Sequence, residues 1–226
     1  MKIAQINMIL YGSTGKIMLQ IAETARKHGH EVRTYSTIPF DKNEHAASIP
    51  TENHFVWGSE KENQLHYYLG TALGRNGCFS KKGTAELIAD LKAFQPDIVH
   101  LHNLHKFCIN LPMLFHYLKE SNVRTVWTLH DCWAMTGQCP HFTMVKCEKW
   151  RTGCEHCPQL NVYPRSRIDN SKWMYAHKKE WFTGVRDMTL VTPSEWLAGL
   201  VRQSFLKDYP VQVINNGIDL SVFHPT

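Results

Sequence analysis

Residues 125–157 read TVWTLHDCWAMTGQCPHFTMVKCEKWRTGCEHC, and the two halves of this stretch differ in character. The first half begins with residues 125–129, whose apolar and β-branched side chains predict a buried strand. His130 and Asp131 follow that strand as a titratable pair. The second half contains Cys139, Cys147, Cys154 and Cys157. The stretch therefore predicts the edge of a functional site, followed by a loop that cysteines hold together.

On both sides of this stretch, apolar β-type segments alternate with segments of helical periodicity. Strands are expected at residues 2–10, 31–37, 54–58, 97–101, 124–129, 188–191 and 211–214. Helices are expected at residues 16–28, 61–75, 83–94, 111–120, 169–182 and 195–205. The alternation predicts an α/β fold with a single Rossmann-like, doubly wound and mostly parallel sheet, interrupted by a Cys-rich insertion.

The composition is that of a folded globular domain. The chain has 226 residues, of which 43% are hydrophobic and 20% are charged. This length suffices for one large α/β domain with a real core. No run of about eighteen apolar residues occurs, so no transmembrane helix is predicted. The net charge of +5 suits anionic ligands such as phosphates or lipid headgroups. Nucleic acid is not expected as a partner.

Cysteine usage and the N-terminus indicate the compartment. The chain has seven cysteines, an odd number, and the crowding between residues 132 and 157 does not suit an evenly disulfide-linked secreted fold. The N-terminal segment MKIAQINMILYGSTG lacks a small-residue cleavage site and leads into a helical pattern. It therefore predicts a first strand rather than a signal peptide. We expect a cytoplasmic protein in a reducing environment.

Polar residues recur where the predicted strands end. Residues 12–15 follow the first strand, His102 and Asn103 end the fourth, His130 and Asp131 the fifth, and Ser194 the sixth. In an open parallel sheet, the carboxyl ends of the strands form the ligand crevice. The sequence therefore predicts one ligand site at this edge.

The first of these strand ends carries Gly12, Ser13, Thr14 and Gly15, expected as a turn before a helix. Backbone N–H groups and the positive end of a helix suit an anion there. The segment is not a Walker loop, because Ile17 stands where Ser or Thr would bind magnesium, and it is not the GxGxxG of dinucleotide dehydrogenases. The alternative is a tight β-to-α turn with no ligand.

Histidines dominate the other strand ends. His130 and Asp131 are predicted to act as a donor and acceptor pair for a sugar hydroxyl, since histidine is near its pKa at neutral pH. The alternative is a structural pair that hydrogen-bonds to a loop. His100, His102 and His105 resemble a metal cluster, but only His100 and His102 share a strand face. Ligand-edge or structural roles are favoured for all three.

The cysteine cluster predicts a structural zinc site. Cys154 and Cys157 have the spacing of a zinc-knuckle half, and Cys139 and Cys147 complete four thiolates for a closed tetrahedral centre. Free thiols or a pair of disulfides are the alternatives. A thioredoxin-like redox motif is disfavoured, because Cys154 follows Gly153 in a loop instead of starting a helix after a strand.

Residues 163–182 mix basic and aromatic side chains. The basic ones are Arg165, Arg167, Lys172, Lys178 and Lys179, and the aromatic ones include Trp173, Tyr175, Trp181 and Phe182. This mixture suits contact with an anionic lipid surface or with an acceptor. The alternative, an amphipathic helix with a solvated basic face, needs no ligand.

Taken together, the motifs resemble the N-terminal half of family 4 glycosyltransferases, GT-B superfamily enzymes of bacterial capsule and exopolysaccharide assembly. The resemblance rests on GSTGKI at 12–17, PDIVHLHNLH at 96–105, TLHDCWAMTGQC at 128–139 and KWRTGCEHCPQL at 149–160. VTPSEWL at 191–197 and VINNGIDLSVFHP at 213–225 complete it. These motifs keep the family's order over essentially the whole chain.

The resemblance implies a retaining, hexosyltransferase-type reaction that needs no catalytic metal. The N-terminal domain would bind a saccharide acceptor, which can be linked to polyprenyl diphosphate, and a C-terminal domain would bind the nucleotide-sugar. His130 and Asp131 would lie by the transferred sugar as candidate catalytic residues. Substrate-binding roles would fall to Gly12, Ser13, Thr14, Gly15, Asn103 and Ser194. A place at the inner face of the membrane would fit such an acceptor.

The resemblance also implies a division of the chain. Residues 1–214 would form the acceptor-side domain and residues 215–226 the start of the interdomain hinge. The family's acidic element with two glutamates and its diphosphate-binding basic residues lie beyond that point, so the donor-binding domain is expected to be absent and the chain inactive alone. The alternative is a stand-alone sugar- or nucleotide-binding module with a structural zinc and no catalysis.

Overall fold

Seven parallel strands form one sheet in the order β3-β2-β1-β4-β5-β6-β7. The computed structural model describes residues 1–37, 52–105 and 107–218. The strands are β1 (Lys2–Ile6), β2 (Glu31–Thr37), β3 (His54–Trp57), β4 (Ile98–Leu101), β5 (Arg124–Thr128), β6 (Met188–Thr192) and β7 (Val211–Val213). Because the order reverses between β1 and β4, the sheet is doubly wound, as predicted, and its switch point lies between these two strands.

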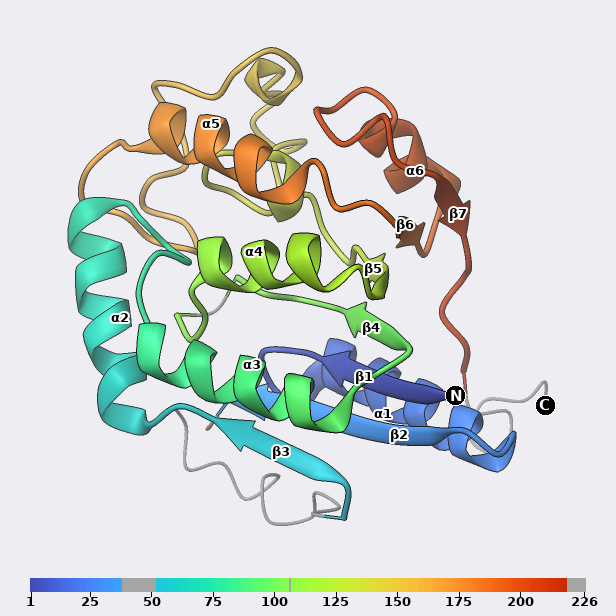
Figure 1. The fold of residues 1–226 in the computed structure, drawn as a ribbon. Helices are drawn as coiled ribbons and strands as arrows, with labels where there is room; N and C mark the ends of the chain where they lie inside the picture. The colour runs from blue at the N-terminus through green and yellow to red at the C-terminus, as the bar shows by residue number, and fades with distance from the viewer. Residues whose placement is uncertain (38–51, 106, 219–226) are drawn as a thin grey trace, which may run out of the picture.

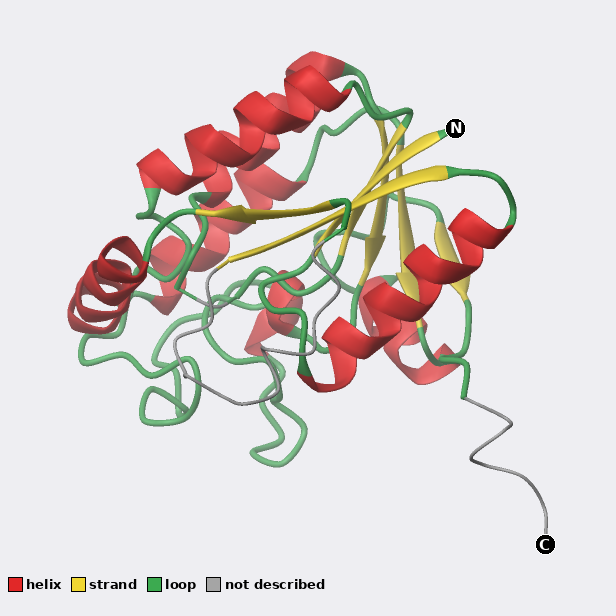
Figure 2. Cartoon of the chain, turned by 90° about the horizontal axis from the view of Figure 1, so that it is seen from below, coloured by secondary structure: helices red, strands yellow, loops and turns green. Residues whose placement is uncertain are grey.

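Helices cover both faces of the sheet. They are α1 (Gly12–Lys27), α2 (Glu60–Leu73), α3 (Lys81–Phe94), α4 (Leu111–Ser121), α5 (Ser171–Phe182) and α6 (Glu195–Val201). Figures 1 and 2 show α1 on one face of the sheet, with α3 and α4 on the other. The predicted α/β class is therefore confirmed. Within the described residues, none of the helices combines the length and the apolar character needed to cross a bilayer.

Three element boundaries differ from the expected ones by four residues, and the other differences are of one or two residues. β1 ends at Ile6 rather than at residue 10, and α1 begins at Gly12 rather than at residue 16. The buried side chain of Asn7 explains the early end, because its amide donates to the Ile9 carbonyl at 2.7 Å and turns the chain. Helix α6 ends at Val201 rather than at residue 205. The Ser204 hydroxyl donates to the Val201 carbonyl at this helix end, at 2.8 Å.

The core joins the sheet to the helices through aromatic rings. Phe115 of α4 and Phe182 of α5 lie 4.5 Å apart between ring centroids, and Phe182 meets Trp127 of β5 at 4.9 Å. The Trp127 indole N–H also donates to the His102 carbonyl at 3.0 Å. The core therefore fixes the backbone at the end of β4, where polar side chains gather.

The Cys-rich insertion occupies residues 132–170, between β5 and α5. Its regular structure consists of two short 3-10 helices, η2 (Trp133–Met135) and η3 (Lys149–Arg151). Phe142 stacks on the buried Trp150 at 4.8 Å, and the Tyr175 hydroxyl of α5 donates to the Trp150 carbonyl at 3.0 Å. The insertion is thus anchored to α5.

The predicted domain division is not tested by the fold. Residues up to 218 are described, and β7 ends at Val213, so most of the predicted hinge at residues 215–226 lies outside the described residues.

Candidate functional site

The switch point between β1 and β4 is held by Asn7, a residue that the sequence analysis missed. Asn7 is fully buried. Its amide oxygen accepts from the Asn103 N–H at 3.0 Å, and its amide nitrogen lies 3.2 Å from the Thr14 hydroxyl. One side chain therefore ties together the end of β1, the end of β4 and the start of α1. No local signal identified it, because Asn7 lies inside the strand that the sequence predicts at residues 2–10.

Residues 12–15 form the first turn of α1 rather than a turn before it. Gly12 has a φ of 74°, a value that favours glycine. A Cβ added at Gly15 would lie 2.3 Å from the carbonyl carbon of Leu10, so packing alone requires glycine there. The N-cap residue Tyr11 makes no side-chain capping bond, and the first turn has no acidic residue. The positive helix end is therefore suited to an anion.

Three histidine rings stack along the ends of β4 and β5. The centroids of His100 and His102 are 4.3 Å apart, and those of His102 and His130 are 5.5 Å apart. His102 Nε2 lies 3.2 Å from the Gln5 amide oxygen, and His102 Nδ1 lies 3.2 Å from His130 Nε2. His100 Nε2 contacts the Thr128 hydroxyl at 2.8 Å. We call these three rings the histidine column.

The column has a defined pattern of protons when its rings are neutral. The Gln5 oxygen accepts only, so His102 Nε2 carries the proton and His102 Nδ1 accepts from His130 Nε2–H. His130 Nδ1 is then the acceptor that remains. Burial lowers the pKa of His130, although the Asp131 charge opposes this effect. Burial also lowers the pKa of His100 to about 4 and that of His102 well below its ordinary value.

Asp131 bonds to His105 rather than to its neighbour His130, and the predicted role of His130 and Asp131 towards a sugar hydroxyl stays a prediction. Its carboxylate lies 2.9 Å from His105 Nε2 and accepts from the Trp133 N–H at 2.8 Å. Burial raises the pKa of Asp131, but the hydrogen bonds from His105 and Trp133 outweigh it and hold this pKa below its ordinary value. His105 Nδ1 in turn lies 2.9 Å from the Tyr163 hydroxyl. The chain thus builds an Asp131–His105–Tyr163 relay beside the column.

The structure brings together the predicted residues at the ends of β4 and β5. A cavity of about 10 Å³ is lined by side chains from the ends of β4 and β5, among them His102, Asn103, His105, His130 and Asp131. Sequence reasoning did not connect His105 with Asp131 or single out Tyr163, because nothing local shows that the insertion returns to the sheet edge. The ligand-edge role that was favoured for the histidines stays a prediction.

Ser194 and the first turn of α1 lie at the same edge but do not line this cavity. Ser194 is the N-cap of α6, where its hydroxyl accepts from the Leu197 N–H at 3.3 Å. This bond gives Ser194 a structural task, and its substrate-binding role stays a prediction.

The four cysteines of the insertion line a second cavity, of about 20 Å³. All seven cysteines of the chain lie within the described residues, and none of them forms a disulfide. In the part of the chain that is described, no three His, Cys, Asp or Glu side chains have the mutual spacing of a formed metal centre. The predicted zinc site stays a prediction.

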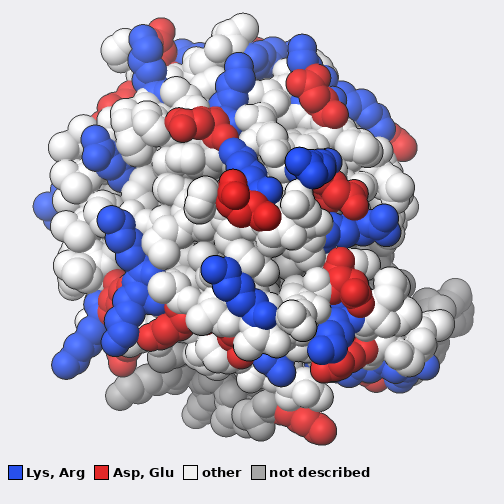
Figure 3. Space-filling view, in the orientation of Figure 1, with Lys and Arg blue, Asp and Glu red and all other residues white. Residues whose placement is uncertain are grey.

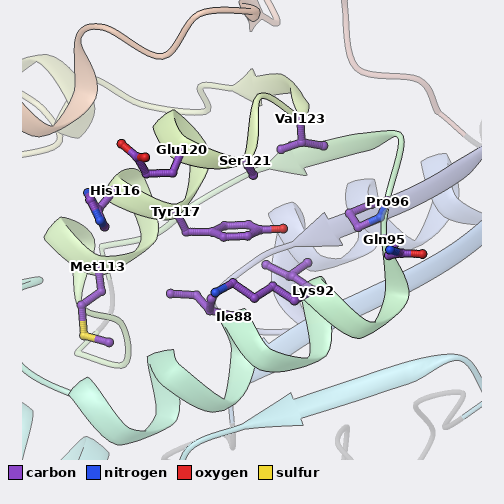
Figure 4. A pocket seen from close by; sticks show the side chains of 11 residues that line it. Ile88, Lys92, Gln95, Pro96, Met113, His116, Tyr117, Glu120, Ser121 and Val123 are labelled. Carbon is purple, nitrogen blue, oxygen red and sulfur yellow. The ribbon is translucent and has the colours of Figure 1, made fainter.

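A larger groove lies at the opposite edge of the sheet. It measures about 710 Å³ and runs between α3 and α4 towards Pro96 and Val123, which precede β4 and β5. Figure 4 shows Lys92 and Tyr117 facing each other across it. On the face in Figure 3, lysine and arginine are interspersed with aspartate and glutamate. The groove holds none of the predicted site residues.

A family profile and a curated relative both indicate a glycosyltransferase. The profile of Glycosyltransferase Family 4 matches residues 14–222. An Escherichia coli (strain K12) protein named as the colanic acid biosynthesis glycosyl transferase WcaC is 35% identical over 133 residues. This alignment covers 56% of the chain and 32% of WcaC, so it spans about a third of that relative.

A solved structure shares the fold. It is described as trehalose-6-phosphate from E. coli bound with UDP-2-fluoro glucose, and it aligns with a TM-score of 0.50 at 14% identity. The alignment covers 98% of the chain and 50% of that protein. At this identity the likeness concerns the Rossmann-like fold alone.

Proposed function

The chain belongs to glycosyltransferase family 4, and on this premise we propose that it forms the acceptor side of a retaining sugar transferase of cell-surface polysaccharide biosynthesis. The co-substrate would be a nucleotide-sugar, and the acceptor a saccharide that can be linked to polyprenyl diphosphate. The name of WcaC, a colanic acid biosynthesis glycosyl transferase, supports the polysaccharide context. Family membership favours this proposal over a binding module without catalysis.

The observation that carries the proposal is the pair of histidine arrangements at the ends of β4 and β5. His130 is held neutral by burial, and the order of protons in the histidine column turns its Nδ1 into an acceptor. An acceptor at this place suits a sugar hydroxyl, which donates one hydrogen bond. We assign His130 the task of orienting the transferred sugar.

Asp131 would act beside it as a fixed negative charge. The hydrogen bonds from His105 and the Trp133 N–H keep the carboxylate ionised and fix its direction. A preorganised charge stabilises positive charge that develops on a sugar during transfer, at little reorganisation cost. His105 and Tyr163 are positioning residues in this scheme, because they act through Asp131.

The first turn of α1 would receive the diphosphate of the donor. Gly12 and Ser13 are exposed there, and the helix start lacks an acidic residue that would repel phosphate. Asn7 couples this turn to the β4 end through Thr14 and Asn103. No divalent metal is needed for the transfer in this proposal, because the helix end supplies the positive potential.

Membrane-bound acceptors would approach the segment at residues 163–182. Arg165, Arg167, Lys172 and Lys179 are exposed, and Trp173 and Trp181 are half-buried. Lys178 is fully buried, so it does not belong to the solvated basic face that the sequence predicted. The free thiols suit the reducing cytoplasm, at the inner face of the membrane.

The test is sugar transfer by the protein as its gene encodes it, assayed with labelled nucleotide-sugars and a polyprenyl-diphosphate-linked saccharide. We expect product with retained anomeric configuration, assigned by NMR. His130→Ala should lower kcat/KM by about 100-fold, the lower range for a positioned group at the reacting centre. His116→Ala, an exposed histidine of α4 on the opposite groove, is the matched control.

Two results would contradict the proposal. One is product of inverted configuration, which would remove the retaining mechanism. The other is a His130→Ala variant as active as the His116→Ala control, which would remove the sugar-orienting role.

A further inference from the structure

Four cysteines that are far apart in the insertion meet at one small cavity. Cys139 follows η2, Cys147 precedes η3, and Cys154 and Cys157 follow η3. All four line a cavity of about 20 Å³, closed on one side by Phe142 and Trp150. That volume holds about one water-sized sphere. The insertion therefore converges on a space for a single small ion.

The backbone donates to one of the four sulfurs. The Gly137 N–H lies 3.2 Å from Cys154 Sγ and donates to it. Hydrogen bonds to the charged form stabilise it, and thiolates are the form that binds metal.

A buried lysine lies against the same segment. Lys178 of α5 is fully buried, and its ammonium donates to the carbonyls of Trp133 at 2.6 Å and Thr136 at 2.9 Å. It also lies 3.4 Å from the centroid of the Trp133 ring. Within residues 1–37, 52–105 and 107–218, no aspartate or glutamate forms an ion pair with it. A buried ammonium without an opposite charge is costly.

The geometry points to one answer for both features: we propose that Cys139, Cys147, Cys154 and Cys157 bind one zinc ion as thiolates, with Lys178 as the buried counter-charge. Four thiolates around Zn²⁺ leave a net charge of −2, which Lys178 offsets in part. Thr136 links the two, because it lines the cysteine cavity and its carbonyl binds Lys178. Binding would draw the four sulfurs inward to bonding distance.

Zinc would also help to position Asp131 and His105 at the proposed sugar site. The insertion supplies the Trp133 N–H that bonds Asp131 and the Tyr163 hydroxyl that bonds His105. Both residues lie on the segment that the four cysteines would hold. The zinc is therefore a structural centre that positions the relay, and it takes no part in the transfer.

The first experiment measures metal and thiols in the unmodified chain, purified under reducing conditions without chelator. We expect about one zinc per chain and four thiols that react only after a chelator removes it. Cobalt(II) in place of zinc should give the visible spectrum of a tetrahedral thiolate site. A chain that binds no zinc, or one that carries disulfides among the four cysteines, overturns the proposal.

Variants locate the site. Cys154→Ser should lose the zinc, whereas Cys78→Ser, which alters a half-buried thiol outside the cavity, should keep it. Zinc bound equally tightly by Cys154→Ser overturns the assignment. If this variant does not fold, the cobalt spectrum of the unmodified chain decides the question, because it reports the sulfur ligands directly.

Lys178→Met tests the counter-charge. Its zinc affinity should fall by about 10- to 100-fold, the effect of losing an outer partner of a metal site. Lys179→Met, which removes an exposed lysine from the same helix, is the control and should bind as the unmodified chain does. Equal zinc affinity of the two variants in chelator competition overturns the role of Lys178.

Discussion

The histidine column and the cysteine cavity are two clusters of titratable side chains that the same chain builds by different means. The column joins β4 to β5, and the Gln5 amide of β1 fixes its protons. Its position comes from strand pairing across the sheet. The cysteines lie within one insertion whose regular structure is two 3-10 turns. In the sheet, backbone hydrogen bonds between strands hold the site in place. A loop that lacks such bonds needs another constraint on its conformation.

Removal of metal should affect the cysteine insertion far more than the histidine column, and it has the largest expected effect. A chelator should lower the free energy of unfolding by about 4 kcal/mol if zinc is present at about 1,000 times its Kd. The loss should begin in the insertion, where Met144 is 90% exposed. Urea unfolding and hydrogen exchange with and without chelator measure it.

Hydrogen exchange then decides whether the two regions are separate. We expect the amides of β1, β4 and β5 to stay protected while those of residues 140–160 exchange. Simultaneous loss of protection in the sheet and the insertion would contradict the distinction, because it would make them one cooperative unit.

Acid should weaken the histidine column. The folded pKa of His100 is about 4, below the ordinary value of 6.5, so the folded state binds fewer protons than the unfolded chain. This contribution to stability is present above pH 6.5 and is lost as the pH falls towards 4. At about 1.4 kcal/mol per pH unit, the loss for His100 reaches about 3 kcal/mol.

The test compares urea unfolding of His100→Gln and the unmodified chain between pH 7.5 and 4, with chelator in both so that zinc release does not contribute. Glutamine keeps a partner for Thr128 but does not titrate, so its acid loss should be smaller. His28→Gln, at an exposed position, is the control. Identical profiles for His100→Gln and the unmodified chain would remove the role of the column.

Gly15→Ala tests the packing of the β1–α1 turn, and its expected loss of stability is smaller than those of metal removal and acid. The new methyl group would meet the Leu10 backbone at 2.3 Å, so the β1–α1 turn must shift. We expect a loss of about 2 kcal/mol in the free energy of unfolding. Gly199→Ala in α6 meets nothing within 4 Å and should stabilise the chain by about 1 kcal/mol. Denaturant unfolding of both variants checks the pair, and a neutral Gly15→Ala would contradict the packing explanation.

The sequence predicted the elements better than their ends. All seven strands and six helices occur, because apolar periodicity reports burial directly. The start of α1 was placed too late, since nothing in residues 7–12 shows that the Asn7 side chain ends β1. Lys178 was assigned to a solvated face, because helical periodicity cannot reveal that an insertion covers that position.

The candidate site followed the same pattern. His130 and Asp131 were identified together because they are adjacent in the chain, yet the structure gives each a different histidine partner. His105 and Tyr163 lie 58 residues apart, and no local pattern links them. Pairs of this kind depend on which strand ends meet and on the path of the insertion.

By itself the sequence determined the fold class, the family and the edge where polar residues gather, because these depend on periodicity and on the order of motifs. The tertiary structure alone decided the partners: His102 for His130, His105 for Asp131, and the carbonyls of Trp133 and Thr136 for Lys178. Hydrogen bonds and buried charges depend on distances of a few ångströms between segments distant in the chain. In residues 125–157, the buried strand and the cysteine-rich loop after it were therefore predictable. The contacts between their side chains and the rest of the fold were not.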